Sequence, residues 1–290
     1  MSVRLAGTVL ALLTLAACAA TSGRNPLARW VPSPNHEPRR PVLIVLHATE
    51  QRSAAESLLT LRTRNTGGPV SAHYLIGRDG ALYQLVSEHR RAWHAGPGRW
   101  GTITDVNSAS IGIELDNDGG APFPEAQLAT LLALLDDLCT RLQIPRTQLI
   151  AHADMAPTRK RDPGAQFPWR ALADVGFGIW PTGPFAEPPP GFDAWLALAA
   201  LGYALDDRDA ALRAFRRRFR AIESDLTDPV APPDPEDARI LHALTKKGTE
   251  GIKLPSNPLR PPFRRHAGFI CPEWLRFRVR RSVPMPRSAR

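Results

Sequence analysis

The sequence predicts a mixed α/β fold in which a mixed β-sheet is flanked by helices, followed by a small C-terminal three-helix domain. Between residues 41 and 180, short apolar runs typical of strands alternate with amphipathic patterns typical of helices, as in domains where helices cover a sheet. A Pro- and Gly-rich linker at 181–191 then precedes three helical patterns within 192–246. We therefore expect one sheet domain and one helical satellite.

The N-terminus is typical of a lipoprotein signal peptide over residues 1–17. Arg4 is followed by an apolar run of roughly 13 residues, too short for the about 20 that span a bilayer. The run ends in Leu15-Ala16-Ala17-Cys18, which resembles the bacterial lipobox, in which the cysteine carries the lipid. By the same resemblance, Ala19 in place of Asp favours the outer membrane, with the protein facing the periplasm of a Gram-negative bacterium. An ordinary signal peptide, with Cys18 incidental, is the alternative.

Charge is unevenly distributed along the chain. The net charge of +9 could indicate nucleic-acid binding, but residues 246–290 hold 12 Lys/Arg against 2 Glu, a net +10, and the rest sums to about −1. No nucleic acid is therefore expected as a partner. Residues 247–290 read as a basic, Pro- and Arg-rich disordered tail, and residues 18–40 as a polar, Pro-rich tether. Cys139 suits a buried helix position, and a bridge from it to Cys271 remains open.

The expected elements follow from local patterns. Five aliphatic residues before His47 predict a strand buried on both faces. In the strand at 110–116, alternation places Ile111, Ile113 and Leu115 on one face and Gly112 and Glu114 on the other. The full predicted order is a strand at 42–47, a capped helix at 53–61, a hairpin at 70–85, a surface loop at 91–107, the strand at 110–116, a helix at 124–142, a strand at 148–152, a helix at 168–173, and helices near 192–203, 208–220 and 235–246.

Two histidines end predicted strands, where α/β sheets place their sites. If the strands ending at His47 and His152 are neighbours, the imidazoles converge, and Asp162 in its Pro- and Gly-rich loop can complete a site with two His and one carboxylate. Catalytic zinc takes three such protein ligands and leaves a position for water. From spacing alone, the alternative is that these residues have a purely structural role, because histidines at strand ends are often held by hydrogen bonds and Asp-Pro-Gly is a common turn.

A series of motifs then resembles one family, the zinc-dependent N-acetylmuramoyl-L-alanine amidases, and most closely the AmpD/AmiD branch of the type-2 amidases, with its AmiD-like lipoproteins. The resemblance covers roughly residues 40–180. The motifs are HAT at 47–49, SAHYLI at 71–76, AWHAG at 92–96, SIGIE at 110–114, HAD at 152–154, RKRDPG at 159–164 and FPW at 167–169.

This resemblance assigns roles to individual residues. It implies that His47, His152 and Asp162 bind Zn²⁺, that Glu114 activates the attacking water, and that Lys160 stabilises the tetrahedral intermediate. The implied reaction is cleavage of the amide between the lactyl group of N-acetylmuramic acid and L-alanine, in peptidoglycan or its muropeptides. A monomer is expected. The alternative is a non-catalytic wall-binding protein on the same fold, but the presence of all five residues favours catalysis.

Further residues fall in motifs similar to the family's and are candidates for binding substrate: His73, Trp93, His94 and Asn107. For the two histidines, shaping the pocket or holding the loop by hydrogen bonds is the competing role. The helices at 192–246 resemble a peptidoglycan-binding module, or they form a structural appendage in which Arg216-Arg217-Arg218 is a solvated face.

Overall fold

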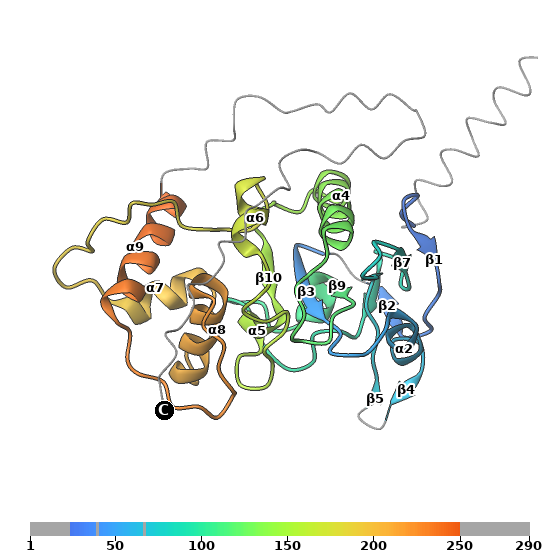
Figure 1. The fold of residues 1–290 in the computed structure, drawn as a ribbon, viewed down its shortest axis with the longest axis horizontal. Helices are drawn as coiled ribbons and strands as arrows, with labels where there is room; N and C mark the ends of the chain where they lie inside the picture. The colour runs from blue at the N-terminus through green and yellow to red at the C-terminus, as the bar shows by residue number, and fades with distance from the viewer. Residues whose placement is uncertain (1–23, 39–40, 66–67, 250–290) are drawn as a thin grey trace, which may run out of the picture. The chain divides into compact units, whose positions relative to one another are not determined.

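The computed structural model describes residues 24–38, 41–65 and 68–249 (Figure 1). The signal peptide, Cys18, Cys271 and nearly all of the basic tail lie outside the described residues, so the expectations for them remain predictions. Within the described part of the chain, no helix is both long enough and apolar enough to cross a membrane.

A mixed sheet forms the centre of the fold, as predicted. Strand β3 lies between β9 and β10 and is parallel to both, whereas β6 and β7 form the predicted antiparallel hairpin. Across the described residues, this main sheet has six strands, in the spatial order β1 (Arg29–Trp30), β7 (Leu82–Gln84), β6 (Tyr74–Ile76), β9 (Ser110–Leu115), β3 (Leu43–Ala48) and β10 (Leu149–Ala151). Shorter pairs join β2 (His36–Pro38) to β8 (Arg90–Ala92) and β4 (Arg64–Asn65) to β5 (Gly68–Pro69).

Helices flank the sheet and form a helical group beyond its β10 edge (Figure 1). Helix α2 begins after Ser53, whose side chain accepts a hydrogen bond from the Glu56 N–H, as the capping pattern predicts. The described helices are α2 (Ala54–Thr60), α3 (Val106–Ala109), α4 (Glu125–Arg141), α5 (His152–Met155), α6 (Trp169–Asp174), α7 (Ala194–Leu201), α8 (Arg208–Arg220) and α9 (Pro235–Thr249).

Alternation along the strands separates the apolar core from the site. In β9, Ile111, Ile113 and Leu115 face α4 and join one large core with its leucines. The opposite face carries Gly112 and Glu114, as predicted. In β3, Leu43 and Val45 lie on this second face in a separate small cluster with Met155 and Val106, and His47 follows them at the same period of two. The sheet therefore presents polar residues where its second face ends.

Two predicted segments differ in the structure. Residues 24–38, expected as part of the tether, belong to the folded domain, because β1 pairs with β7. The buried Asn25 also donates two hydrogen bonds, one from its side chain to Asp137 and one from its backbone N–H to the side chain of Gln84. The segment 91–107 is not wholly a surface loop, because His94 and Ala95 are buried and α3 begins at Val106. Neither difference could be predicted from the pattern of these segments, which are rich in proline or glycine. Side-chain hydrogen bonds help to hold them in place, and such bonds leave no regular periodicity in the sequence.

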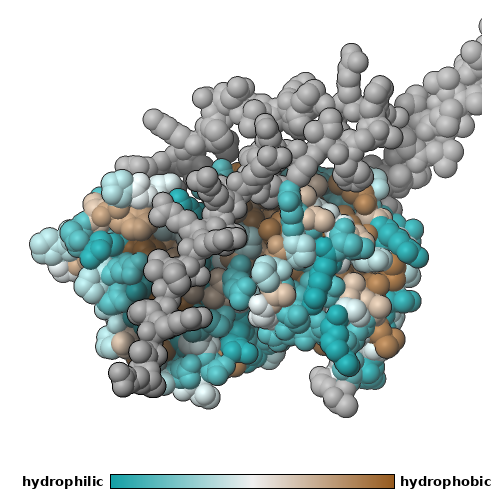
Figure 2. Space-filling view, viewed as in Figure 1, coloured by the Kyte–Doolittle hydropathy of each residue, from teal (hydrophilic) through white to brown (hydrophobic). Residues whose placement is uncertain are grey.

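The three C-terminal helices share the core of the sheet domain. Leu198 of α7, Phe215 of α8 and Leu241 of α9 lie in the same buried cluster as Ile44 and Leu149 of the sheet. Residues 24–249 thus form one compact unit, and the segment 181–191 connects elements without dividing the core. The visible described surface is mostly hydrophilic with smaller apolar patches (Figure 2).

Candidate metal centre and active site

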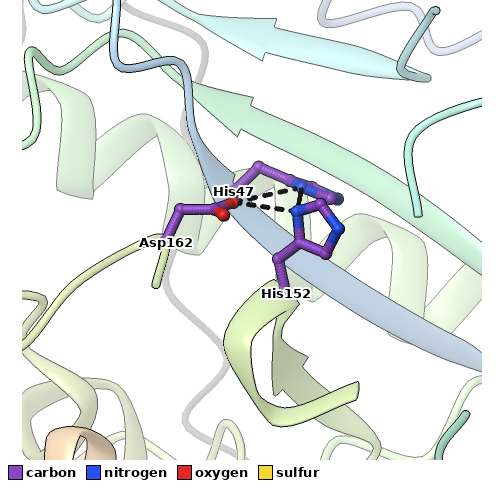
Figure 3. Close-up of side chains that lie close together, drawn as sticks. All are labelled: His47, His152 and Asp162. Carbon is purple, nitrogen blue, oxygen red and sulfur yellow. Dashed lines mark hydrogen bonds and ion pairs between the residues drawn. The ribbon is translucent and has the colours of Figure 1, made fainter. Parts of the chain in front are cut away.

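Three protein side chains converge at the carboxyl ends of β3 and β10 (Figure 3). His47 lies near the end of β3, His152 begins α5 directly after β10, and Asp162 reaches in from the loop that follows. The Nδ1 atoms of His47 and His152 are 2.9 Å apart, and Asp162 Oδ2 is 3.3 Å from the first and 3.1 Å from the second. The pairing of β3 with β10, which was the condition set by the sequence, is met.

Hydrogen bonds assign the tautomer of His47 through His94. The Ser110 hydroxyl donates to the Val106 carbonyl at 2.6 Å, so its oxygen accepts from His94 Nε2–H at 3.2 Å. His94 Nδ1 is then left as an acceptor for His47 Nε2–H at 3.0 Å. This network leaves His47 Nδ1 with a lone pair directed at His152 and Asp162.

His152 has the matching tautomer. Its Nε2 lies 2.9 Å from the Ala95 carbonyl oxygen, which can only accept, so Nε2 carries the proton. The lone pair of His152 Nδ1 therefore faces that of His47, with the Asp162 carboxylate beside both. Three acceptors at 2.9–3.3 Å repel one another unless a proton or a cation lies among them. Two imidazoles, each oriented by a hydrogen bond at its far ring nitrogen, and one carboxylate are a donor set that fits a transition metal.

Electrostatics favour a cation over a proton at this position. Burial, together with the neighbouring His152 and Lys160 and against the opposing effect of Asp162, lowers the pKa of His47 to about 4. Burial alone would raise the pKa of Asp162, but the neighbouring His152 and His47 rings outweigh this effect and hold that pKa well below its ordinary value. His47 is therefore neutral and Asp162 ionised near neutral pH, which is the state that binds metal.

Glu114 lies next to this group. It pairs in register with His47 across β9 and β3, and its carboxylate is 4.0 Å from His47 Nδ1. Burial, then repulsion from Asp162, raises the pKa of Glu114 to about 8, although Lys160 opposes the shift. A carboxyl group whose pKa lies near neutrality is suited to accept and return a proton. The structure thus brings the two predicted catalytic residues to the predicted metal ligands.

The group opens into a cleft of about 180 Å³. Glu114 and Lys160 both line it, together with Trp93, Glu50 and Thr60. Lys160 follows α5 in the loop that leads to Asp162, so one short segment supplies both a cation and a ligand from different directions. The cleft gives a substrate access to all five predicted residues.

The four predicted substrate-binding residues have different positions. Trp93 and His94 line the cleft, and Trp93 is half-buried there, so direct substrate contact by Trp93 stays a prediction. His94 holds His47. His73 is fully buried, with Nδ1 accepting from Gly112 N–H and Nε2 directed to the Arg90 carbonyl, and Asn107 accepts from the N–H groups of His94 and Ala95. The competing role, stated above for the two histidines, therefore fits the contacts of His73 and His94, and Asn107 makes loop-holding contacts of the same kind.

Sequence reasoning missed several residues around the site. Arg159 donates to the carbonyl oxygens of Ala95 and Pro97 and so fixes the loop against which His152 rests. Ser110 determines the tautomer of His94. Trp100 packs edge-on against Tyr203, with ring centroids 5.0 Å apart. Arg159 and Ser110 carried a signal, since they belong to the RKRDPG and SIGIE motifs.

Known proteins resemble this chain in both sequence and structure. The family model described as N-acetylmuramoyl-L-alanine amidase matches residues 37–165. The amidase AmiD of Escherichia coli (strain K12) is 40% identical over 161 residues, which are 50% of this chain and 56% of AmiD, so the match spans little more than half of that relative. The 1,6-anhydro-N-acetylmuramyl-L-alanine amidase AmpD of Enterobacter cloacae is 34% identical over 161 residues, covering 49% of this chain and 86% of AmpD.

Solved structures extend the likeness to the helical group. Escherichia coli AmiD, in complex with the substrate anhydro-N-acetylmuramic acid-L-Ala-D-γ-Glu-L-Lys, aligns with a TM-score of 0.61 at 32% identity, over 75% of this chain and 93% of AmiD. AmpDh3 of Pseudomonas aeruginosa, in complex with an anhydromuramic pentapeptide, aligns with a TM-score of 0.60 at 30% identity, over 78% and 98%. This chain therefore belongs to the N-acetylmuramoyl-L-alanine amidase family, in the AmpD/AmiD branch of the type-2 amidases.

Proposed function

We propose that this protein is a zinc-dependent N-acetylmuramoyl-L-alanine amidase that acts on peptidoglycan or its anhydro-muropeptides during cell-wall turnover. The observation that carries the proposal is the convergence of two imidazole lone pairs and one carboxylate beside Glu114 in an open cleft. The names of the relatives supply the substrate class, since AmiD and AmpDh3 have been solved with anhydromuramic peptides.

His47, His152 and Asp162 would hold the zinc ion. Zinc bound there supplies a Lewis acid that polarises a carbonyl and lowers the pKa of water to about 7. Both histidine ligands are oriented from behind: His94 fixes His47, and the Ala95 carbonyl fixes His152. These contacts keep both Nδ1 atoms deprotonated and aimed at one point.

Glu114 then acts as the general base and Lys160 as the electrostatic partner. The Glu114 carboxylate accepts a proton from the attacking water and returns it to the departing L-alanine nitrogen. A positioned acid–base group contributes about 10²–10⁴-fold to the rate. The Lys160 ammonium, close enough to lower the pKa of both Glu114 and His47, stabilises the negative charge that develops on the carbonyl oxygen.

Mass spectrometry of digested muropeptides tests the reaction. The purified full chain is incubated with anhydro-muropeptides of defined peptide length, with and without a chelator, and again after zinc is returned. We expect free peptides beginning with L-alanine, no product with the chelator, and recovery with zinc. Glu114→Gln serves as the matched control. Cleavage at another bond, or undiminished cleavage with the chelator, would contradict the proposal.

The alternative function is non-catalytic binding of peptidoglycan by the same cleft. It predicts that muropeptides bind but remain intact under all three conditions of the same experiment. The complete set of His47, His152, Asp162, Glu114 and Lys160 around one cleft favours catalysis, because binding alone gives no reason for a general base beside a metal centre.

We further propose that lipid on Cys18 anchors the protein to the outer membrane, facing the periplasm, and that it acts as a monomer. The support is the Leu-Ala-Ala-Cys sequence and Ala19 after it. Cys18→Ser should move the protein from the membrane fraction to the soluble one, whereas Cys139→Ala should not. A high-salt wash removes protein that the basic tail at residues 247–290 holds on the membrane by charge. The monomer is tested separately, by measuring the mass of the protein by light scattering. Retention of Cys18→Ser after that wash would overturn the anchor.

A further inference from the structure

Helix α5 supports two of the three metal ligands at once. It begins with His152, and the N–H of its second residue, Ala153, donates to the backbone carbonyl of Asp162 at 3.0 Å. Any displacement of α5 therefore moves both ligands relative to His47. With only four residues, α5 cannot fix its own position, because isolated helices shorter than about 12–15 residues are marginal in water.

Asp154, in the same short helix, is where outside contacts converge. Its side chain is fully buried, and Oδ2 accepts from the Ala151 N–H at 2.8 Å, which ties α5 to the end of β10. The remaining partners come from the C-terminal helices. Tyr203, just after α7, donates its hydroxyl to Oδ1 at 2.7 Å, and Arg218 of α8 donates to Oδ2.

Arg218 is itself held in place. It is 4% exposed, donates to the Leu149 carbonyl of β10 at 3.0 Å, and its guanidinium lies 4.2 Å from the centre of the Trp169 ring. Figure 1 shows α8 beside α5. One guanidinium thus links α8, α5, β10 and α6. The interpretation of Arg216-Arg217-Arg218 as a solvated face is wrong, because Arg217 and Arg218 are both buried.

We propose that Tyr203 and Arg218 are positioning residues for the metal centre, and that the C-terminal helices are part of the catalytic unit. They act through Asp154, which holds α5 and with it His152 and the backbone of Asp162. The inference rests on the proposed function only in taking the His47 group for a metal centre. It assigns the helices a role at the active site, whether or not they also bind the cell wall.

Zinc affinity of the full-length protein is the test. Arg218→Gln leaves the buried Asp154 carboxylate without its cation, and Tyr203→Phe removes a single hydroxyl with little change in packing. Partners that orient metal ligands typically change metal affinity by about 10- to 100-fold when removed. We expect a loss in that range for Arg218→Gln and a smaller one for Tyr203→Phe, measured by competition with a chromophoric chelator. The visible spectrum of the cobalt-loaded protein should change as well.

Arg216→Gln is the matched control. Arg216 lies in the same helix, but its hydrogen bonds go to the buried Asp237 and to the carbonyl oxygens of Ala231 and Pro232, away from Asp154. It should lower the melting temperature while leaving zinc affinity within about twofold of the wild type, well below the change of about 10- to 100-fold that the loss of an orienting partner causes. If Arg218→Gln does not fold, Tyr203→Phe carries the test alone. Unchanged affinity and cobalt spectrum in the Asp154-contact variants would overturn the proposal, as would an equal loss in Arg216→Gln.

These outcomes are separate from those for the proposed function. Metal affinity is measured without substrate, so a protein that binds zinc but cleaves no amide would refute the amidase proposal and leave this one standing. Conversely, if the protein is an active amidase but its zinc affinity is unchanged in Tyr203→Phe and Arg218→Gln, only the positioning role is refuted.

Discussion

Gly112→Ala should weaken the metal centre without touching any ligand. Gly112 lies on the site face of β9, beneath the ring of His94, and its backbone is not in the left-handed region, so alanine is compatible with the strand. A Cβ there would lie 2.4 Å from His94 Cγ and 2.6 Å from Cδ2 and Nδ1. The backbone cannot yield easily, because Gly112 pairs with β3 and is hydrogen-bonded to His73 on both its N–H and C=O groups.

The ring of His94 must therefore retreat by about 1 Å, since carbon atoms pack at about 3.5–4.0 Å. Its 3.0 Å hydrogen bond with His47 would then stretch beyond hydrogen-bonding distance. Loss of such a partner weakens metal binding by about 10- to 100-fold, which reduces the stabilisation by saturating zinc by about 1.4–2.7 kcal/mol. Overpacking adds about 1–3 kcal/mol of destabilisation in both states.

Thermal unfolding with and without zinc separates the two effects. Overpacking lowers the melting temperature of the metal-free protein, whereas the loss of metal affinity reduces the zinc-induced rise by roughly 3–10 °C. Gly120→Ala is the control, because a Cβ there meets only Asp118 Oδ1 at 3.9 Å. An undiminished zinc-induced rise in Gly112→Ala would refute the argument that His94 holds His47 in place.

Four further predictions concern the site itself. Glu114→Gln should keep zinc affinity but reduce turnover by about 10²–10⁴-fold in a muropeptide cleavage assay, and near-normal turnover would exclude Glu114 as the base. Because the pKa of Glu114 is raised from 4.5 to about 8, the metal-free wild type should lose folding stability as the pH rises from 5 to 8. The Glu114→Gln variant should therefore become more stable relative to the wild type over that range, as measured by urea unfolding with a chelator present. A pH-independent difference would contradict this shift. Asp162→Ala should lose zinc by elemental analysis, and a fully loaded variant would rule out Asp162 as a ligand. Lys160→Met should reduce kcat by about 10²–10³-fold with zinc affinity retained, and a change in zinc affinity alone would indicate a structural role instead.

Local pattern predicted the parts of the fold that depend on periodicity. The alternation of Ile111, Ile113 and Leu115 correctly predicted that Glu114 lies on the site face, and two strands ending in His47 and His152 predicted where the ligands meet. These predictions succeeded because a period of two fixes which side a residue faces.

Contacts between distant elements could not be predicted in this way. Arg218 looked exposed within an arginine run, because its buried partner Asp154 lies 64 residues earlier. The hydrogen bond from His94 to Ser110 depends on ring orientation, which spacing does not encode. Asn25 anchors the start of the domain by donating from its backbone N–H to Gln84 and from its side chain to Asp137, two residues far along the chain, so a segment with tether-like composition is folded.

That anchored Asn25 also determines how far the enzyme can reach. A flexible tether over residues 18–40 could extend about 80 Å from a lipid on Cys18, at about 3.3–3.6 Å per residue. Because the fold is already fixed at Asn25, only seven residue steps remain, which span at most about 25 Å. If Cys18 carries lipid, the start of the fold at Asn25 lies within about 25 Å of the membrane surface. So short a tether would keep the whole domain near the membrane that holds the lipid, instead of letting it range across the space beyond.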